Sequence, residues 1–444
     1  MLLIPLLVGP LALAAAPSQG APAGLPCNEC AQTVWYVDAD SLTNGPGDSW
    51  ATAFQRLPPA INAAAPGDCI WVAEGVYTPT NSANRAKSFT FNKALNVFGG
   101  FAGDELCFSN RKGNFWGTVL SGDIGMPGDS TDNSYTVVSI EGVSVVGMKT
   151  DVVLDGFRIT DGNNEAVGTS TGGGLLMMAG SKLRLENSFV RRNQAALGGG
   201  ICSLGGDLSI VDTGIAWNQA KDGAGMYLAG GKVRVFDCAF RRNVASRNGG
   251  ANYLIGMSPS TVSRWANDIF EGNQADRGGA MYLEVGEIKP PPINVVYPGR
   301  AHLVGCTVTR NIASLEGPGL AAIDHPALLD LAGHLQVENS IVWNNTGPKP
   351  EIVGWLATDV TYSIVPPTSP FGGGLNLPLD PLMIPPNFRL SNGSPAIDAG
   401  INAAILTDEL DLDGDGDLLE PTPIDWYERP RVQGGVVDMG ASER

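Results

Sequence analysis

A short pattern that recurs in the middle of the chain is the feature that most constrains its fold. Each copy begins with Asn, has Ala two residues later, and then runs into small residues and Gly. The copies are NQAALGGGI from Asn193, NQAKDGAGM from Asn218, NVASRNGGA from Asn243, NQADRGGAM from Asn273 and NIASLEGPG from Asn311, with a degenerate copy from Asn345. Their starts lie 25, 25, 30, 38 and 34 residues apart. A repeat of this period predicts a solenoid, in which stacked units share one core.

The residues before each Asn indicate which solenoid this is. Apolar residues occupy the positions three and eight before the Asn, as Val190 and Leu185 do in the first copy. Positions five apart cannot both point inward along one straight strand, because alternate residues face opposite sides. A corner must lie between them, and position six before the Asn supplies residues that tolerate left-handed backbone. That column holds Asn187, Asp212, Asp237, Asn267, Gly305 and Asn339.

Short strands, two corners in each coil and a Gly-rich return predict an all-β chain folded as a parallel β-helix. Helical repeats are excluded, because 58 Gly and 31 Pro among 444 residues would destabilise helix interiors. We interpret the repeated Asn as a structural corner residue whose amide pairs with backbone groups. This column holds Asn193, Asn218, Asn243, Asn273 and Asn311.

Motifs along most of the chain resemble those of exported β-helix proteins. The segments FRRN…NGGA from Phe240 and FEGN…RGGAM from Phe270 resemble the repeats of polymorphic outer-membrane proteins. Residues 36–79 are similar to the entry region of pectin-lyase-like right-handed β-helix proteins, and residues 96–103 and 154–163 also match such proteins. SPAIDAG at 394–400 and residues 429–443 resemble the choice-of-anchor domains that end these chains.

The resemblance implies a right-handed β-helix with an N-terminal capping helix and a small C-terminal domain. The capping helix would run from Ala53 to Ala65, with Pro58 and Pro59 kinking or restarting it. We expect a signal peptide and short linker at 1–26, an entry and capping segment at 27–68, the β-helix at 69–365 and a choice-of-anchor-like domain at 366–444. The usual setting of such proteins is the exterior or surface of a Gram-negative-type bacterium.

The N-terminal sixteen residues, MLLIPLLVGPLALAAA, fit a secretory signal peptide, because an apolar run ends in small residues. No later stretch approaches the ~20 apolar residues that a membrane-spanning helix needs. The sequence therefore predicts a secreted, extracellular or cell-surface protein without a transmembrane span.

Net charge argues against nucleic acid as a partner, and the absence of phosphate-binding motifs argues against a nucleotide cofactor. The chain has 45 acidic and 28 basic residues and a net charge of −17, whereas a general nucleic-acid-binding protein would be basic. Phosphate-binding motifs are absent, and Gly317-Pro318-Gly319 falls on the glycine position of the repeat, so no nucleotide cofactor is expected.

Seven cysteines are too few and too scattered to form a disulfide scaffold. Cys27 and Cys30 form a lone C-x-x-C, which we interpret as a local disulfide or as inert thiols. The pairing of Cys27, Cys30, Cys69 and Cys107 stays open. Cys238 and Cys306 share a column but lie two coils apart, roughly 9–10 Å, so both are expected to remain reduced.

A second column, one residue before each Asn, is the candidate glycan-binding site. An exposed Trp flanked by Arg can stack a sugar ring and bind acidic glycan groups. The alternative is an ordinary solvated surface, on which Arg side chains cover apolar area. The candidate residues are Arg192, Trp217, Arg242 and Arg310.

Two acidic groups are candidate calcium ligands. Asp411, Asp413, Asp415 and Asp417 resemble the start of an EF-hand loop, although position 12 is Thr422; the alternative is a solvated acidic turn. Asp212 and Asp237 lie on adjacent coils and could bind calcium or form an acid–base pair, or they could simply be corner residues.

These observations favour a secreted or cell-surface β-helix protein with a structural, adhesive or glycan-binding role. The partners would be extracellular polysaccharides or other cell-surface components. The alternative is a polysaccharide lyase or glycoside hydrolase of the pectin-lyase-like fold. Such an enzyme should have a cleft on one face of the coils with clustered Asp, Glu, Lys or Arg, because its chemistry needs acid, base or electrostatic groups. The sequence favours the non-enzymatic role and identifies no catalytic residue.

Overall fold

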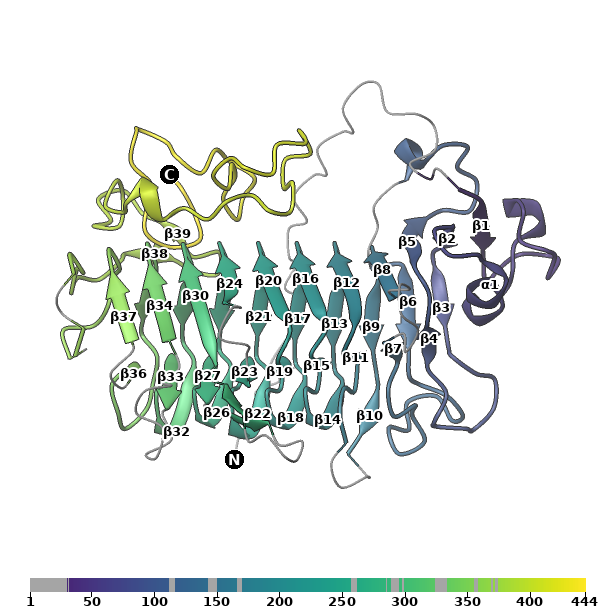
Figure 1. Ribbon diagram of the computed structural model, residues 1–444, viewed down its shortest axis with the longest axis horizontal. Coiled ribbons are helices and arrows are strands. Elements are labelled where there is room, and N and C mark those ends of the chain that lie inside the picture. Colours follow the sequence, from purple (N-terminus) through teal and green to yellow (C-terminus); the bar gives the residue numbers. More distant parts are fainter. Residues whose placement is uncertain are drawn as a thin grey trace, which may run out of the picture.

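The computed structural model describes residues 30, 32–111, 116–142, 150–165, 170–256, 262–284, 286–288, 295–297, 299–323, 334–354, 358–368, 370–371 and 374–444. Within them the chain forms a right-handed parallel β-helix, with its strands stacked along the long axis of the molecule (Figure 1). The predicted fold class is confirmed. No described helix is long and apolar enough to cross a membrane, and the predicted signal segment lies outside the described residues.

Four parallel sheets, here named A to D, line the solenoid. Sheet A contains β1 (Val34–Val37), β2 (Cys69–Ala73), β5 (Leu95–Phe101), β8 (Thr150–Asp155), β12 (Ser181–Glu186), β16 (Asp207–Val211), β20 (Lys232–Phe236), β24 (Ser263–Ala266), β30 (Arg300–Val304), β34 (His334–Glu338) and β37 (Thr358–Thr361). Sheet B contains β3 (Gly75–Tyr77), β6 (Thr118–Ser121), β9 (Arg158–Thr160), β13 (Phe189–Arg191), β17 (Gly214–Ala216), β21 (Ala239–Arg241), β25 (Ile269–Glu271), β31 (Thr307–Thr309) and β35 (Ile341–Trp343).

The return side of each coil forms the other two sheets. Sheet C contains β4 (Phe89–Phe91), β7 (Val138–Ile140), β11 (Leu175–Met178), β15 (Ile201–Leu204), β19 (Met226–Ala229), β23 (Asn252–Ile255), β27 (Met281–Glu284), β33 (Leu320–Ile323) and β36 (Ile352–Gly354). Sheet D contains β10 (Asn163–Asn164), β14 (Gln194–Leu197), β18 (Gln219–Asp222), β22 (Val244–Asn248), β26 (Gln274–Arg277) and β32 (Ile312–Glu316). Two antiparallel pairs lie outside them, β28 (Gly286–Ile288) with β29 (Val295–Tyr297), and β38 (Met383–Ile384) with β39 (Arg389–Leu390).

The core is a stack of like residues from successive coils. Leu185 pairs with Ile210, and Ile210 with Val235, all buried inside sheet A. On sheet B, Phe240 and Phe270 stack with ring centroids 4.8 Å apart. Because each coil covers the apolar face of its neighbour, the core is continuous along the solenoid.

Both corners of the A–B side use left-handed backbone. The column six before the Asn has φ between 45° and 63°, which agrees with its Asn, Asp and Gly content. A second column, directly before the Asn, also has positive φ, between 53° and 66°, although it carries large side chains. That second column holds Asp161, Arg192, Trp217, Arg242, Gly272, Arg310 and Asn344.

The Asn residues themselves form a continuous buried ladder behind this second corner. The Nδ2 group of Asn243 donates to the Ile215 carbonyl at 2.8 Å and to Asn273 Oδ1 at 3.0 Å. Its Oδ1 accepts from both nitrogens of Asn218. These hydrogen bonds fix each corner against its neighbours, which offsets the cost of the strained residue before each Asn.

The N-terminal end is closed by helix α1 (Leu57–Ala63), which buries Leu57, Ala60 and Ile61. Pro58 and Pro59 occupy the first turn and neither kink nor restart the helix, because a first-turn residue needs no intrahelical N–H bond. Strand β1 already pairs in parallel with β2, so the solenoid begins inside the segment expected to be only an entry region. Three short 3₁₀ turns are Trp50–Thr52, Phe108–Asn110 and Asn402–Ala404.

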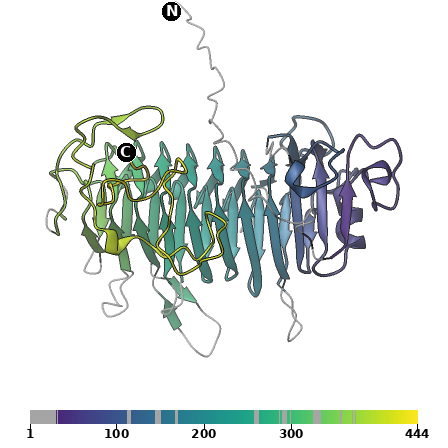
Figure 2. The same ribbon diagram turned by 90° about the horizontal axis from the view of Figure 1, so that it is seen from above.

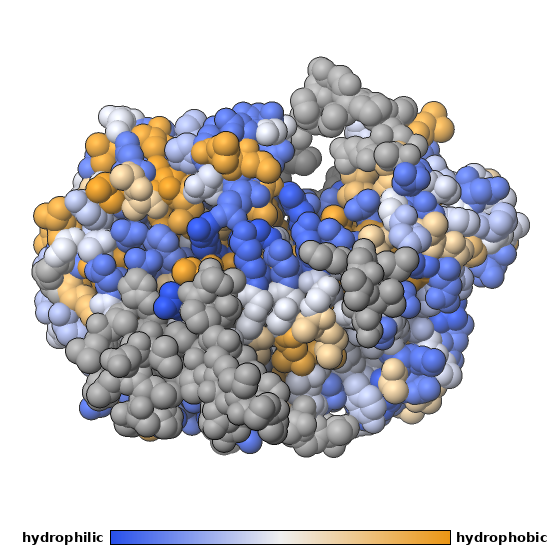
Figure 3. Space-filling view, in the orientation of Figure 1, coloured by the Kyte–Doolittle hydropathy of each residue, from blue (hydrophilic) through white to orange (hydrophobic). Residues whose placement is uncertain are grey.

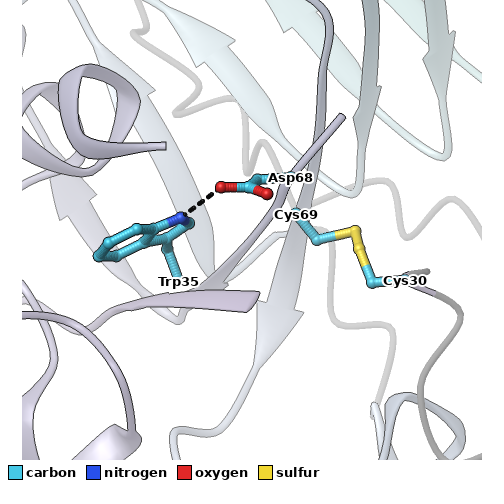
Figure 4. Close-up of a disulfide and its surroundings, with 4 residues drawn as sticks. All are labelled: Cys30, Trp35, Asp68 and Cys69. Atoms are coloured by element: carbon cyan, nitrogen blue, oxygen red, sulfur yellow. Dashed lines mark hydrogen bonds between the residues drawn. A yellow bond between two sulfur atoms is a disulfide. The ribbon is translucent and has the colours of Figure 1, made fainter. Parts of the chain in front are cut away.

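A disulfide joins Cys30 to Cys69, with Cα atoms 6.1 Å apart, and ties the start of the chain to β2 (Figure 4). Neither interpretation of the C-x-x-C, a local disulfide or inert thiols, holds for Cys30, because it pairs across the cap. Cys27 lies outside the described residues, and Cys107 is also disulfide-bonded. Cys202, Cys238 and Cys306 are free and buried, so the expectation that Cys238 and Cys306 stay reduced is confirmed.

The C-terminal segment, residues 374–444, lies over one end of the β-helix (Figures 1 and 2). It is mostly irregular, and its buried apolar residues belong to clusters that also contain β-helix residues, such as Leu406 and Leu410 with Phe236. Apolar side chains also gather on its outer surface (Figure 3). The segment is therefore a cover on the solenoid, since it lacks a core separate from it.

Candidate functional site

The outer face of sheet B has two outward-facing columns. The residue three before each Asn points into the core, so its two neighbours on the strand point outward. The parallel register aligns these neighbours from coil to coil. One column runs Arg158, Phe189, Gly214, Ala239 and Ile269, and the other runs Thr160, Arg191, Ala216, Arg241 and Glu271.

Three aromatic rings form a run on this face, which we name the aromatic shelf: Trp116, Phe189 and Trp217. Trp116 and Phe189 have ring centroids 4.9 Å apart, and Phe189 and Trp217 meet edge-on at 6.1 Å. Both Trp side chains are 39% exposed. Gly214 permits this arrangement, because a Cβ there would lie 2.3 Å from the Phe189 ring.

A small hollow, of about 40 Å³, lies beside the shelf. Its floor consists of the small residues Gly214, Ala216 and Ala239. Phe189 and Trp217 bound it on one side, and Arg241, Arg242 and Glu271 bound it on the other. An apolar floor with aromatic and guanidinium rims suits a flat ring that carries hydroxyl groups.

One arginine, Arg191, lies over two rings of the shelf. The Arg191 guanidinium lies 5.0 Å from the Trp217 ring centroid and 5.5 Å from that of Phe189. Burial lowers the pKa of Arg191, and the neighbouring Arg192 and Arg158 lower it further. Arg241 lies 3.4 Å from Glu271 and so has a carboxylate partner.

The structure separates the four predicted glycan-binding residues. Trp217 and Arg242 line the hollow, and Arg192 lies next to Trp217 in the left-handed corner column. Arg310 is further along that column, where its guanidinium lies 5.3 Å from the Phe388 ring and 3.5 Å from Glu271. Arg310 is thus engaged by the C-terminal segment and is not part of the hollow.

Sequence reasoning identified Arg191 as a neighbour of the corner column but missed Phe189 and Glu271 as members of this face. The signal was present, because the residues on either side of the buried strand position must point outward. Reading positions four and two before the Asn would have found both. Trp116 precedes β6 and belongs to no repeat, so no periodic pattern could have placed it there.

The acidic loop brings some of the predicted calcium ligands together. Carboxylate oxygens of Asp411, Asp413 and Asp415 lie within 4.8 Å of one another, and Asp408, Asp413 and Glu420 form a second such group. Asp417 belongs to neither group. The carboxylates also accept backbone N–H groups within the loop, as Asp411 does from Gly416 at 3.0 Å.

Asp212 and Asp237 are left-handed corner residues with φ of 45° and 55°. Burial raises the pKa of Asp212 to about 7, and it also raises the pKa of Asp237, which the neighbouring Asp212 raises further. Neither belongs to a group of three clustered ligands in the described part of the chain. The corner-residue interpretation is the one that this geometry favours.

A second depression, of about 300 Å³, lies between sheet A and the C-terminal segment. Arg264, His302, Glu338 and Tyr362 line it together with residues 401 and 403–407. His302 Nε2 and a Glu338 oxygen are 2.7 Å apart, and this contact lowers the pKa of Glu338. The cleft therefore holds a histidine–carboxylate pair, which no sequence motif indicated.

No protein-family model matches the chain, and no curated protein matches it. Among solved structures, the pectate lyase Pel9A is similar at 14% identity and a TM-score of 0.45, with 93% of this chain and 96% of that chain covered. A rhamnogalacturonan lyase is similar at 13% identity and a TM-score of 0.43, with 80% and 91% covered. A pectin methylesterase is similar at 12% identity and a TM-score of 0.42, with 74% and 93% covered. The likeness concerns the fold alone.

Proposed function

We propose that the protein is a secreted or cell-surface β-helix that binds glycans on the outer face of sheet B. The observation that carries this proposal is the run of Trp116, Phe189 and Trp217 beside an apolar hollow. Trp116 and Trp217 are each 39% exposed, which costs solvation free energy, and a sugar ring stacked on them would remove that cost. Phe189 is buried and contacts both Trp rings. Strands stacked along the solenoid axis also suit an extended polymer as ligand.

The test is a binding assay with a panel of soluble polysaccharides, using calorimetry or affinity electrophoresis. Trp217→Ala should weaken binding of any ligand about two- to twelvefold, because stacking is worth about 0.5–1.5 kcal/mol beyond area burial and about 1.4 kcal/mol is a factor of ten. Val76→Ala is the matched control: Val76 is 64% exposed and lies in the outward column of Phe189, three strands away. Equal losses in the two variants, or no binding to any polysaccharide, would contradict the proposal.

Calcium binding at the acidic loop is a second proposal, with a structural role. It is supported by the clustering of Asp411, Asp413 and Asp415, because hard cations prefer several carboxylate oxygens. Calcium should raise the unfolding temperature of the wild type by mass action and leave an Asp413→Asn/Asp415→Asn double variant unchanged. If both proteins melt at the same temperature with calcium and with chelator, the acidic loop is a solvated turn that binds no calcium.

A polysaccharide lyase or glycoside hydrolase is the alternative function, and the sheet A cleft is the observation that favours it. A histidine–carboxylate pair beside Arg264 offers a base and a positive charge. If this alternative holds, product release from a polysaccharide panel should be lost in His302→Gln. Intact polymers after prolonged incubation of the wild type, with and without calcium, would exclude it.

Export is also part of the proposal. It is supported by the apolar N-terminal run at residues 1–16 and by the resemblance of the repeats and of residues 394–400 to exported surface proteins. Cell fractionation of a host that expresses the full chain is the test. The expected result is a processed form outside the cytoplasm or on the surface, and a cytoplasmic unprocessed form would contradict it.

A further inference from the structure

Four arginines around the aromatic shelf have no side-chain hydrogen bond or ion pair with any residue that the structure describes. They are Arg158, Arg191, Arg192 and Arg242. Arginines elsewhere in the molecule do have such partners, as Arg111 with Asp155 and Arg247 with Asp222. The unpaired cations are gathered on one face of a chain whose net charge is −17. On an acidic surface, arginines without a specific role are expected to be scattered and paired with carboxylates, whereas these four are gathered and unpaired among the described residues.

The sheet register brings three of them together. Arg158 lies beside Phe189 on the neighbouring strand, and Arg191 is the second outward residue of Phe189's own strand. Arg192 follows directly at the left-handed corner, next to Trp217 in its column. We name these residues, Arg158, Arg191 and Arg192, the arginine cluster.

The surroundings of the arginine cluster offer little compensating charge. Asp161 is the carboxyl that interacts with all three, and burial raises its pKa. Arg191 also has a buried Nε atom without a hydrogen-bond partner among the described residues. An unpaired buried donor and mutual repulsion of like charges are both destabilising, so the cluster is incomplete without an anion.

We propose that the ligand of the shelf carries an oxyanion, a carboxylate or a sulfate ester, and that the arginine cluster binds it. This inference rests on the proposed glycan-binding function and specifies the class of glycan. A guanidinium binds an oxyanion through two parallel N–H···O bonds, and the rings under Arg191 hold its plane in place. The stacked sugar and its anionic group would therefore occupy adjacent positions on sheet B.

The experiment compares matched ligands that differ only in charge. One pair is a uronic-acid oligosaccharide and its methyl ester, and the other is a sulfated galactan and its desulfated form. Calorimetry should give at least tenfold tighter binding for the charged member of at least one pair. The pair that shows the difference identifies the oxyanion as carboxylate or sulfate. Added salt should weaken that binding selectively.

Variants connect the effect to the arginine cluster. Arg191→Gln should abolish the preference, so that the charged and the neutral member of the pair bind with equal affinity. Arg192→Gln, at an exposed corner, should reduce the preference and serves as a second variant if Arg191→Gln folds poorly. Arg277→Gln is the control, because Arg277 belongs to sheet D and pairs with Glu316 at 2.9 Å.

The possible failures are distinguishable. Equal affinity for charged and neutral members, with binding that still depends on Trp217, would overturn this inference and keep the proposed function. An equal loss of preference in Arg277→Gln would also overturn it, because general electrostatic attraction would then explain the result. Absence of binding to all four ligands and to the polysaccharide panel would overturn both proposals.

Discussion

Single side chains of the Asn ladder hold the left-handed corner, and Asn243 shows the consequence. Its amide takes part in four hydrogen bonds, two donated and two accepted, and it is fully buried. Replacement by Leu removes the amide that accepts from the buried Asn218 backbone N–H and donates to the Ile215 carbonyl. It also removes one of the two hydrogen bonds of Asn218 Nδ2 and one of the two of Asn273 Oδ1. We expect Asn243→Leu to lower the free energy of unfolding by about 2–4 kcal/mol, measured by denaturant titration.

Gln219→Leu is the matched control for this prediction. Gln219 directly follows the ladder residue of its coil, carries the same amide group and is exposed. A change below about 0.5 kcal/mol is expected, because exposed substitutions rarely alter stability more. Similar effects of the two substitutions would mean that the ladder amides contribute no specific stabilisation.

The end of the ladder is sensitive to pH through Glu351. Asn345 Nδ2 donates to Glu351 at 2.6 Å, and burial raises the pKa of this carboxyl from 4.5 to about 7. The pKa of Glu351 is higher in the folded than in the unfolded state, so its protonated carboxyl contributes to stability. This contribution is complete at a pH below the unfolded-state pKa of about 4.5. That stabilisation is lost as the pH rises from about 4.5 to 7.

Glu351→Gln should therefore remove part of the pH dependence of stability. We expect the difference between wild type and variant to change by about 1–3 kcal/mol between pH 4.5 and 7, with the wild type relatively weaker at pH 7. Unfolding curves at several pH values measure it. Glu165→Gln, on an exposed turn, is the control, and an identical pH profile for wild type and Glu351→Gln would contradict the assignment.

At the scale of elements, the N-terminal cap depends on a covalent connection. The Cys30–Cys69 bond closes a separation of 39 residues across β1 and α1. Near it, the Trp35 indole donates to Asp68 at 2.9 Å (Figure 4). Cys30→Ser/Cys69→Ser should lower unfolding stability by about 2–4 kcal/mol, because the unfolded chain gains entropy.

A reductant supplies the control for the cap prediction. It should lower the melting temperature of the wild type more than that of the Cys30→Ser/Cys69→Ser variant. Hydrogen exchange should quicken first in β1 and α1, while the coils from β12 to β31 stay protected by neighbours on both sides. Uniform destabilisation of all coils would show that the cap is not a separate unit of stability.

Elements also show how far the sequence could predict the fold and the site. The first corner was predictable, because Asn, Asp and Gly at Asn187, Asp237 and Gly305 directly indicate left-handed backbone. The second corner was predicted at the Asn, but its left-handed residue is the one before, where Arg and Trp carry no such preference and are held by the ladder behind them. The column directly before the Asn nevertheless identified Trp217 and Arg242 as candidate site residues, because a position that recurs once per coil lies on one face of the solenoid.

The parts of the site that sequence could not supply depend on packing between distant segments. Trp116 reaches the shelf from a non-repeated connection, and Phe388 of the C-terminal segment removes Arg310 from it. The His302–Glu338 pair joins the adjacent strands β30 and β34 of sheet A with an offset of two residues, but nothing in either local sequence marks it. Such contacts follow from the path of irregular segments, for which periodicity gives no information.

At the scale of the whole molecule, the C-terminal segment is attached to sheet A by charge as well as by apolar burial. Glu409 lies 2.9 Å from Lys232 and 3.6 Å from Arg234, and it also pairs with Arg264. Three cations from two adjacent strands thus share one carboxylate. Removal of that carboxylate leaves Lys232 and Arg264 without this partner, while Arg234 keeps Asp207, and the three contacts that tie the segment to sheet A are lost together.

Glu409→Gln should therefore loosen the C-terminal segment while the solenoid stays folded. We expect at least tenfold faster hydrogen exchange over residues 401–412, and faster proteolysis there, with protection of sheets A to D unchanged. Glu316→Gln, which breaks a single pair with Arg277, is the control and should alter neither. Unchanged exchange over 401–412 in Glu409→Gln would mean that the apolar contacts of Leu406 and Leu410 alone hold the segment. Loss of protection throughout the solenoid would instead mean that the segment and the coils unfold as one unit.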